Sequence, residues 1–426
     1  MTAFLAFPPA RELRGVLRVP ASKSATNRAL LLAALSDTPV RVEGPLESED
    51  TRALLACLAA MGARIEKQGD SLSLCGPLHG GSEERVLDAA DSGTAARFLI
   101  AVCAATEGRF RLVGSPRLSE RPMGELVTAL RSLGANIREE GAPGCLPVIV
   151  RGSPGCIRGG AAAVDASRSS QFLSALLLAG AAAGSIEVSA SGAVASLPYV
   201  ALTIEALRAF GHDVEGSGPW RVRRGSRSPD AYTTPGDFSS AVPLLSGVGI
   251  CGGEVSLTGL RWPSPEADAL AIPVLAVMGV QIETPGNEIR ARAVRGGLRS
   301  VSALATDFPD AVPALAAAAA FARGRTRFHG IAHLRWKESD RLAALSTLLA
   351  RAGAAAVADE DGLSIDGGGI SAVSDFVVLP TARDHRIAMA AALLSLARPR
   401  ALIENPDCVS KSYPGFFRDL EALCRR

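Results

Sequence analysis

The sequence repeats one short pattern six times along its length. The pattern is Leu-x-x-apolar-Gly, and its copies start 68 to 77 residues apart: Leu58–Gly62, Leu130–Gly134, Leu207–Gly211, Leu275–Gly279, Leu349–Gly353 and Leu420–Cys424, the last with Cys in the Gly position. After each of the first five copies, polar and apolar residues alternate over a short run, as in 63–74. A Gly that ends a helix, followed by alternation of period two, is typical of a helix that passes into a strand. The chain is therefore predicted to contain six copies of one α/β unit.

A second helix recurs at nearly the same period. It begins with small or polar residues and continues as an Ala-rich apolar run, and its starts lie near Ser24, Thr94, Ser170, Ser240, Asp310 and His385. Helices that are apolar on nearly every face are predicted to be buried. The other helices, such as 51–61 and 338–352, are amphipathic, so we expect them to cover the outside.

The segment 226–235 is rich in Ser, Pro and Arg and indicates a linker, with three units on each side. A chain of 426 residues also exceeds what one hydrophobic core usually holds. The fold is therefore predicted to be α/β, with two similar domains of three repeats each. A solenoid is the alternative, but its repeats usually span about 20–50 residues, so closed triplets are favoured.

The polar helix starts indicate a function. The amino end of a helix presents free N–H groups and a partial positive charge, which suit phosphate and carboxylate groups. For one helix, ordinary capping by Ser, Thr or Asp is the simpler interpretation. Six such starts in register favour a site for anions.

Composition argues against several classes of protein. A net charge of +2 and an aromatic content of 4% do not suit a nucleic-acid-binding surface. Residues 1–14 lack the pattern of a secretory leader, and the apolar stretches 172–184 and 311–322 are shorter than the roughly 18 residues of a membrane helix. The eight Cys residues form no Cys-x-x-Cys pair, so we expect reduced thiols, a cytoplasmic location and no membrane partner.

Lysine is rare, with only Lys23, Lys67, Lys337 and Lys411 among 45 basic residues. A chain that uses Arg almost everywhere can retain Lys where a compact ammonium is needed, although chance retention explains a single case equally well. The segment 21–28 places Lys23, Ser24 and Arg28 on the first turns of a buried helix. Buried cations there require anionic partners.

From this segment onwards the sequence resembles the EPSP (5-enolpyruvylshikimate-3-phosphate) synthase family, nearly end to end. No single motif is decisive, but their joint order and spacing are specific. The further matching motifs are Ser92–Arg97, Glu120–Gly124, Ser169–Phe172, Ser196–Tyr199, Pro309–Asp310, Lys337–Arg341, Asp384–Arg386 and Lys411.

The resemblance implies a fold and a reaction. Each domain is expected to contain three βαβαββ units with buried helices, with 21–235 as one domain, 1–20 plus 236–426 as the other, and the active site in the cleft between them. The implied reaction transfers the enolpyruvyl group of phosphoenolpyruvate to the 5-hydroxyl of shikimate 3-phosphate and releases phosphate, in the shikimate pathway to chorismate and aromatic amino acids. We expect a monomer without cofactor or metal, and a target of glyphosate.

The resemblance also implies substrate contacts. Ser169, Ser170 and Ser196 are expected to hold the shikimate phosphate, and Lys23, Ser24, Arg28 and Gln171 to bind the same substrate. Hydroxyls and helix-end N–H groups are suitable phosphate ligands. The phosphoenolpyruvate set is Arg121, Arg341, Arg386 and Lys411, whose guanidinium groups match carboxylate and phosphate bidentately. Further contacts are expected at Gly93, Thr94, Asp310, His333, Lys337 and His385.

The same resemblance assigns the proton transfers. Asp310 is expected to accept the proton of the attacking hydroxyl, although a plain helix cap is its alternative role. Glu338 is expected to protonate the methylene carbon, and Lys23 to share that relay. Such an acid needs a raised pKa, which neighbouring cations oppose.

Four positions depart from the common family pattern. Asp91 stands where many relatives have Asn, and His333 stands where some relatives have Asn. Arg168 stands where relatives often have an apolar residue, and Trp336 is bulkier than the usual Val. An extra carboxylate at Asp91 would repel an anion, whereas Arg168 could add a phosphate contact. Gly93 is typical of glyphosate-sensitive members, which predicts inhibition competitive with phosphoenolpyruvate.

Other functions compete with this interpretation. The UDP-N-acetylglucosamine enolpyruvyl transferases share the architecture but use a loop Cys as acid and an Asn after the early Lys, where this chain has Ser24. An inactive anion-binding protein of the same fold would not need Asp310 and Glu338, and a nucleic-acid-binding repeat protein would need a basic stripe. Gly247–Gly252 matches a dinucleotide fingerprint in letters only, because a helical run precedes it, and His329 with His333 lacks a third zinc ligand.

Overall fold

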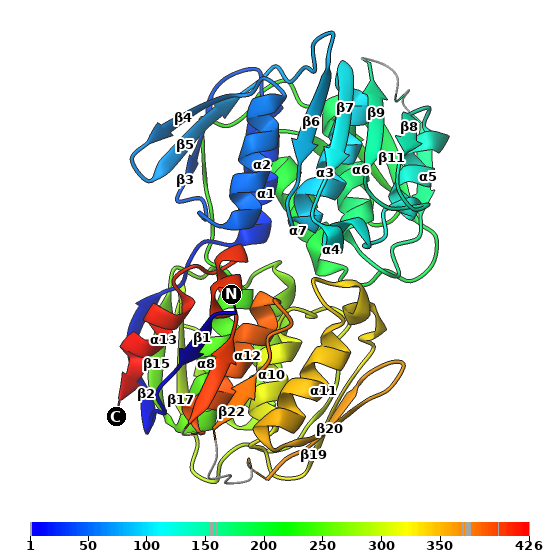
Figure 1. The fold of residues 1–426 in the computed structure, drawn as a ribbon. Helices are drawn as coiled ribbons and strands as arrows, with labels where there is room; N and C mark the ends of the chain where they lie inside the picture. Colours follow the sequence, from blue (N-terminus) through cyan, green and yellow to red (C-terminus); the bar gives the residue numbers. More distant parts are fainter. Residues whose placement is uncertain are drawn as a thin grey trace. The chain divides into compact units, whose positions relative to one another are not determined.

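The structure is a computed structural model that describes residues 2–153, 157, 160–368, 370, 376–398 and 400–425. The chain divides into two compact units, unit I (Ala21–Thr234) and unit II (Met1–Pro20 with Pro235–Arg426) (Figure 1). The boundaries expected from the sequence differ from these by one residue, at the second crossing.

Unit I contains three four-stranded sheets with one arrangement. In spatial order, the first strand of each sheet runs parallel to the second, and the third runs antiparallel to the second. The third and fourth strands form an antiparallel hairpin. In spatial order the sheets are β14 (Ala231–Thr233), β3 (Val40–Glu43), β5 (Ser71–Cys75) and β4 (Arg64–Gln68); β6 (Glu84–Asp88), β7 (Gly108–Val113), β9 (Val148–Gly152) and β8 (Asn136–Glu139); β10 (Ala161–Val164), β11 (Ser185–Ala190), β13 (Trp220–Arg223) and β12 (Asp213–Glu215).

Unit II repeats the arrangement with two changes. Its first sheet has a fifth strand, which pairs antiparallel with the strand formed by residues 12–18. Its third sheet has three strands, and β1 pairs with β23 where the other sheets place the end of a hairpin. The sheets are β16 (Val280–Glu283), β17 (Glu288–Ala293), β15 (Gly253–Thr258), β2 (Glu12–Arg18) and β24 (Cys424–Arg425); β18 (Ser302–Leu304), β19 (Arg325–His329), β21 (Leu363–Asp366) and β20 (Ala355–Ala358); β1 (Phe4–Ala6), β23 (Ala401–Glu404) and β22 (Val377–Leu379).

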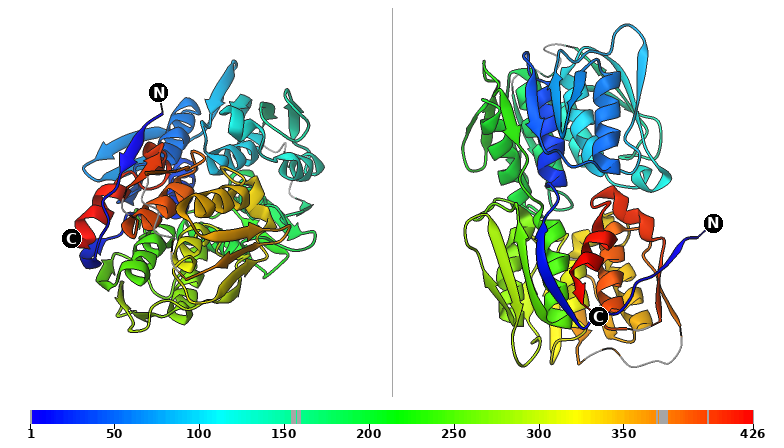
Figure 2. Two further views of the ribbon diagram at one scale, coloured as in Figure 1. Left: turned by 60° about the horizontal axis from the view of Figure 1, so that its bottom comes forward. Right: turned by 90° about the vertical axis from the view of Figure 1, so that its left-hand side faces the viewer.

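In each unit, one strand of the first sheet comes from a distant part of the chain. β2 runs parallel to β15 in unit II, as the right-hand view of Figure 2 shows, and β14 runs parallel to β3 in unit I. The prediction of a linker over 226–235 is therefore wrong for Ala231–Thr233, which form β14. Three residues are too few for an alternating pattern, so composition alone pointed to a linker.

The Ala-rich helices are buried at the centres of both units. They are α1 (Lys23–Ala34), α3 (Gly93–Ala105), α6 (Gln171–Ala183), α8 (Phe238–Cys251), α10 (Val312–Ala319) and α12 (His385–Leu396). Figure 1 shows α8, α10 and α12 side by side in unit II, and every residue of α12 is buried. The predicted helix starts are confirmed to within two residues. The dinucleotide interpretation of Gly247–Gly252 fails as expected, because α8 ends there.

The remaining helices cover these cores, and the longer ones are amphipathic except for Ala271–Met278, which has only apolar residues. They are α2 (Glu49–Ala60), α5 (Gly124–Ser132), α7 (Pro198–Ala209), α9 (Ala271–Met278), α11 (Arg341–Ala352) and α13 (Phe416–Leu423), with the shorter α4 (Pro116–Ser119), η1 (Ala267–Leu270), η2 (Ala332–Trp336) and η3 (Pro406–Lys411). α11 begins three residues later than expected, because Asp340 caps it by accepting a hydrogen bond from the backbone N–H of Ala343 at 3.1 Å. Glu338 thus lies outside the helix. Within the described part of the chain, no helix combines the length and apolarity that a membrane crossing requires.

The position of β2 can be tested through stability. Leu13 on β2 is fully buried in the core of unit II, whereas Val16 on the same strand is 72% exposed. We expect Leu13→Ala to cost about 2–5 kcal/mol and Val16→Ala about 0.5 kcal/mol or less. In Leu13→Ala, amide hydrogen exchange should become faster in peptides of unit II and stay unchanged in unit I. Faster exchange confined to unit I would contradict the assignment of β2.

Candidate active site

The start of α1 in unit I holds a buried ion pair. Ser22 caps the helix by accepting a hydrogen bond from the N–H of Ala25 at 3.2 Å, which places Lys23 on the first turn. The Nζ of Lys23 lies 2.9 Å from Oδ2 of Asp50, and both side chains are almost completely buried. Sequence reasoning missed Asp50, although the capping box of Ser48 and Thr51 marks the first turn of α2. The buried ammonium therefore has a carboxylate partner within its own unit.

Arg28 lies one turn further along α1 and is also buried. Its guanidinium donates to Oγ1 of Thr203 at 2.8 Å, the carbonyl of Tyr199 at 3.1 Å and the carbonyl of Ser24 at 2.9 Å. It also lies over the ring of Phe98, 5.2 Å from the ring centroid. Arg28 thus connects α1 with α7, and its contact with substrate stays a prediction.

Helices α3 and α6 are joined at their starts by Gln171. Its Nε2 donates to Oγ1 of Thr94 at 3.1 Å, and its Oε1 accepts a hydrogen bond of 2.6 Å from Arg97. Arg97 also donates to the carbonyl of Pro122 at 3.0 Å and lies over the ring of Phe172. Arg97 was not among the predicted site residues, although it ends the motif 92–97. It fixes the rotamer of Gln171, so we assign it a positioning role.

The three predicted phosphate-binding serines lie at the starts of α6 and α7. Ser169 accepts a hydrogen bond from the N–H of Gln171 at 3.2 Å, and buried Ser170 precedes α6 without making a side-chain capping bond. Ser196 is buried with a φ of 59°, a left-handed conformation that costs a non-Gly residue about 1–2 kcal/mol. Such strain concentrates at functional sites.

Gly93 and Arg121 lie in close contact. A Cβ on Gly93 would be only 2.6 Å from Nη1 of Arg121 and 2.8 Å from its Cζ. The guanidinium of Arg121, which is almost completely buried, therefore lies directly against the backbone of Gly93 at the start of α3. A side chain at this position would fit only if that guanidinium moved.

In unit II, three carboxylates surround the guanidinium of Arg341. Its Nη1 lies 2.7 Å from Asp310, its Nη2 2.8 Å from Glu338 and its Nε 2.8 Å from Asp384. The Arg341 side chain has no exposed surface. Burial lowers the pKa of Arg341, but the three carboxylates outweigh burial and hold it well above its usual value. One permanent cation therefore brings together two of the three predicted proton-transfer residues, Asp310 and Glu338.

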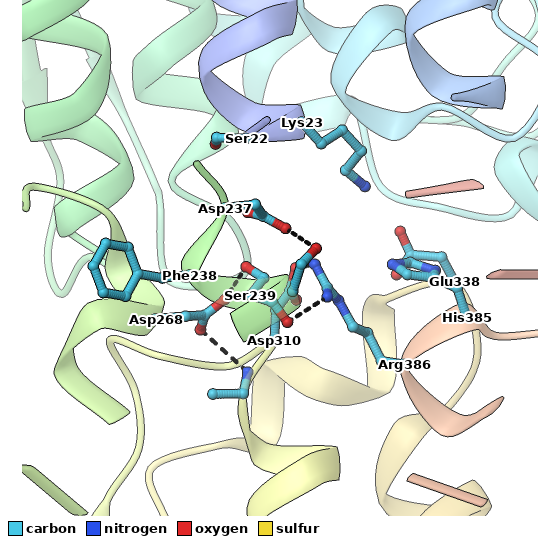
Figure 3. A network of polar contacts seen from close by, with 12 residues as sticks. Ser22, Lys23, Asp237, Phe238, Ser239, Asp268, Asp310, Glu338, His385 and Arg386 are labelled. Carbon is cyan, nitrogen blue, oxygen red and sulfur yellow. Dashed lines mark hydrogen bonds and ion pairs between the residues drawn. The ribbon is translucent and has the colours of Figure 1, made fainter. Parts of the chain in front are cut away.

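Asp310 also contacts Arg386 at the start of α12. Their closest N and O atoms are 3.7 Å apart, and Arg386 donates to the carbonyl of Ser239 on α8 at 2.8 Å (Figure 3). Burial raises the pKa of Asp310, but the charges of Arg341, Lys337 and Arg386 outweigh burial and hold this pKa well below its usual range. Asp310 is therefore ionised at neutral pH in the unliganded protein.

The remaining predicted residues of unit II border this cluster. His385 starts α12, with Nδ1 3.7 Å from Asp384, and buried Lys411 ends η3, which packs on α12. Burial and the charge of Lys337 lower the pKa of His333 to about 3, so its imidazole is neutral at physiological pH. Among the described residues, Nε2 of buried His333 has no hydrogen-bond partner. No group of three potential ligands that could hold a metal occurs in the described residues.

Two of the departures have local explanations. Asp91 accepts a short hydrogen bond from Ser115, whose Oγ also caps α4 at the N–H of Leu118. Arg168 lies 3.4 Å from Glu125 and is half-exposed, as in an ordinary surface ion pair. Of the four lysines, Lys67 matches no family motif and forms an exposed pair with Glu47.

Comparison with known proteins indicates the family. Residues 8–420 match the sequence profile of EPSP synthase (3-phosphoshikimate 1-carboxyvinyltransferase). The chain is 39% identical to the 3-phosphoshikimate 1-carboxyvinyltransferase of Laribacter hongkongensis (strain HLHK9), over 99% of both chains.

Solved structures agree in fold. EPSP synthase from Acinetobacter baumannii superposes with a TM-score of 0.78 at 29% identity, over 100% of this chain and 98% of that one. The enolpyruvyl transferase NikO from Streptomyces tendae superposes with a TM-score of 0.77 at 22% identity, over 98% and 96% of the two chains. The second likeness concerns the fold alone.

Replacing Arg341 tests whether it neutralises the carboxylates. In Arg341→Met, burial should raise the folded-state pKa of Asp310 above its unfolded value. Stability is then retained at low pH and lost as the pH rises through that folded-state value. We expect a loss of about 3–5 kcal/mol at pH 8, measured by urea denaturation. The loss should be smaller at pH 5.

The exposed Arg351 at the end of the same helix is the control. Arg351→Met should change stability by about 0.5 kcal/mol or less at both pH values. A loss in Arg341→Met that is independent of pH would refute the electrostatic explanation.

Proposed function

The chain belongs to the EPSP synthase family, and we propose that it transfers the enolpyruvyl group of phosphoenolpyruvate to the 5-hydroxyl of shikimate 3-phosphate. The carrying observation is the buried Arg341, which holds Asp310 and Glu338 within hydrogen-bonding distance of one guanidinium. A base and an acid on one cation suit an addition in which one group loses a proton and another gains one. The cytoplasmic location and the monomeric state stay predictions.

The two substrates explain the abundance of cations. Shikimate 3-phosphate and phosphoenolpyruvate together carry about six negative charges when fully ionised. In unit I the serines at the starts of α6 and α7, with Lys23, Ser24, Arg28 and Gln171, bind shikimate 3-phosphate. Phosphoenolpyruvate is bound by Arg121 of unit I and by Arg341, Arg386 and Lys411 of unit II. The proposal requires both units to act on the same pair of substrates.

In the addition step Asp310 takes the proton of the 5-hydroxyl while the oxygen of that hydroxyl attacks C2 of phosphoenolpyruvate. A carboxylate with so low a pKa is a weak base in the unliganded protein. Bound phosphate and carboxylate groups would neutralise Arg341, Lys337 and Arg386, which depress that pKa. Substrate binding thereby strengthens the base at the moment it is needed.

Glu338 delivers a proton to the methylene carbon, and Lys23 shares this relay. The result is a tetrahedral intermediate in which that carbon is a methyl group, and loss of a methyl proton and of phosphate gives the enolpyruvyl ether. Arg341 has one positive charge for three carboxylates, so its hydrogen bond to Glu338 does not require that carboxyl to be ionised. Lys411 offers a mobile point charge to the departing phosphate.

Two observations oppose the rival transferase. Ser24 follows Lys23 where that family has Asn, and Cys103 lies inside α3, fully buried. Burial raises the pKa of the Cys103 thiol well above its usual value, which makes it unsuitable as an acid in this reaction. The deciding experiment follows phosphate release from phosphoenolpyruvate with shikimate 3-phosphate or UDP-N-acetylglucosamine as acceptor. Release only with the second acceptor would refute the proposal.

Replacing Asp310 tests its role as base and the rival idea of an inactive binding protein. Asp310→Asn keeps the shape of the side chain but removes its basicity, so kcat should fall by about 100- to 10,000-fold. Calorimetry should show an affinity for shikimate 3-phosphate within about threefold of the wild type.

Asp340→Asn is the matched control, because Asn also caps helices well and Asp340 has no proposed contact with substrate. Its kcat should stay within about threefold of the wild type. Turnover that survives Asp310→Asn would contradict the assignment of the base.

Replacing Gly93 tests the position of Arg121. The added methyl group of Gly93→Ala must displace the guanidinium, so the KM for phosphoenolpyruvate should rise about tenfold or more. The affinity for shikimate 3-phosphate should be unchanged. Glyphosate is longer than phosphoenolpyruvate, so it should inhibit the wild type competitively with phosphoenolpyruvate and inhibit the variant less. Inhibition that is insensitive to phosphoenolpyruvate would refute this placement.

A further inference from the structure

A buried carboxylate of unit II, Asp268, lies behind the proposed site. Asp268 lies on η1 and is 1% exposed. Its Oδ1 accepts a hydrogen bond from the backbone N–H of Ala311 at 3.1 Å, and its Oδ2 accepts a short hydrogen bond from Oγ of Ser239 (Figure 3). The reaction proposed above uses neither this side chain nor its two partners.

Both partners of Asp268 adjoin residues of the proposed site. Ala311 directly follows Asp310, so the bond to its N–H restrains the backbone that carries the proposed base. Ser239 uses its own carbonyl to accept a hydrogen bond of 2.8 Å from Arg386. The carboxylate of Asp268 is thus connected to Asp310 through the N–H of the next residue, Ala311. It is connected to Arg386 through Ser239, whose hydroxyl bonds to Asp268 and whose carbonyl bonds to Arg386. Asp310 and Arg386 are themselves 3.7 Å apart.

The same bonds join three helix starts. Ser239 belongs to the first turn of α8, Ala311 immediately precedes α10, and Arg386 is the second residue of α12. Ala311 cannot cap α10 with its own side chain, and its N–H is shared by the carboxylate of Asp268 at 3.1 Å and the carbonyl of Phe308 at 3.2 Å. Asp268 therefore contributes to the spacing of the three starts.

The charge of Asp268 is sensitive to its neighbours. Burial raises its pKa to about 7, the charge of Asp310 adds to the rise, and Arg386 and the hydrogen bond from Ser239 oppose it. Asp237, at the start of α8, also raises it. These groups face Asp268 from the starts of α8, α10 and α12.

We propose that Asp268 is a positioning residue for the reaction, setting the placement of Asp310 and Arg386 relative to each other from behind the site. The inference rests on the proposed function of Asp310 and Arg386. Ionised Asp268 also repels the charge on Asp310, which raises the proton affinity of that base. A residue that only stabilised the fold would have neither effect.

Glu266 provides a matched control. It is a buried carboxylate two residues away, and its Oε2 accepts a hydrogen bond of 2.9 Å from the N–H of Phe238 at the start of the same helix α8. Glu266→Gln removes the charge of a buried carboxylate at the start of α8 and keeps an oxygen for the N–H of Phe238, whereas Asp268→Ala removes the acceptor used by Ala311 and by the hydroxyl of Ser239.

The test compares Asp268→Ala, Asp268→Asn and Glu266→Gln with the wild type. We expect Asp268→Ala to raise the KM for phosphoenolpyruvate about tenfold and lower kcat about tenfold or more, with the affinity for shikimate 3-phosphate within about twofold. Asp268→Asn still offers an oxygen to Ala311, so its KM should rise by about threefold or less. Glu266→Gln should leave kcat and both affinities within about twofold.

The pH profile separates the charge from the shape of Asp268. The ratio of wild-type to Asp268→Asn kcat/KM should rise from about pH 6 to about pH 8, because Asp268 ionises in that range in the wild type alone. A flat ratio would refute the effect of charge. The positioning role is overturned if Asp268→Ala changes kcat and KM no more than Glu266→Gln does.

Two further measurements make every result decisive. If the wild type releases no phosphate, the proposed function fails, and positioning is judged instead by the affinity for phosphoenolpyruvate measured by calorimetry. That affinity should fall about tenfold in Asp268→Ala and not in Glu266→Gln. If Asp268→Ala is unstable, the measurements are repeated at low temperature with Asp268→Asn, where an unchanged pH profile would overturn the proposal.

Discussion

The burial of six helices that are apolar on nearly every side is the constraint on which the rest of this protein depends. A helix such as α12, in which every residue is buried, has no solvent-facing side for charged groups. Polar residues therefore concentrate at its amino end, where the backbone also leaves N–H groups unbonded. Because one repeat is used six times, both units gather hydroxyl, cationic and carboxylate groups at helix starts.

Arginines inside these helices are tolerated only with several partners. Arg28 and Arg97 lie within the first two turns of α1 and α3, and each donates to neighbouring helices or loops and lies over a phenylalanine ring. Arg341 has three carboxylates and Lys23 has Asp50. In a medium of low dielectric such pairing is required, because an isolated buried charge costs several kcal/mol or more.

This pairing has a consequence for the proposed reaction. In the unliganded protein Lys23, Arg341 and Arg386 are paired with carboxylates of the same unit, so anionic substrates must exchange partners with these cations. The pairing in the unliganded protein keeps the site close to electrical balance and orients its charged groups before the substrates arrive. It also couples binding to proton affinity, since Asp310 becomes more basic as its neighbouring cations acquire other partners.

The sequence by itself determined the period of the fold, the burial of the Ala-rich helices and the positions of their starts. These features follow from local patterns, namely helical periodicity, Gly at helix ends and small polar residues before apolar runs. The motif positions also came from the sequence, and the structure brings Asp310, Glu338 and Arg341 together as the resemblance implied.

Tertiary structure alone decided which distant segments meet. Strand β14 has only three residues and forms because β3 offers an edge, so no pattern in 226–235 revealed it. Asp50, Arg97 and Asp268 likewise acquire their roles from partners on other helices, 27 residues away for Asp50 and 43 for Asp268. A sequence pattern records the periodicity of one element, whereas the hydrogen bond of a buried side chain depends on how several elements pack, and that packing exists only in the folded chain.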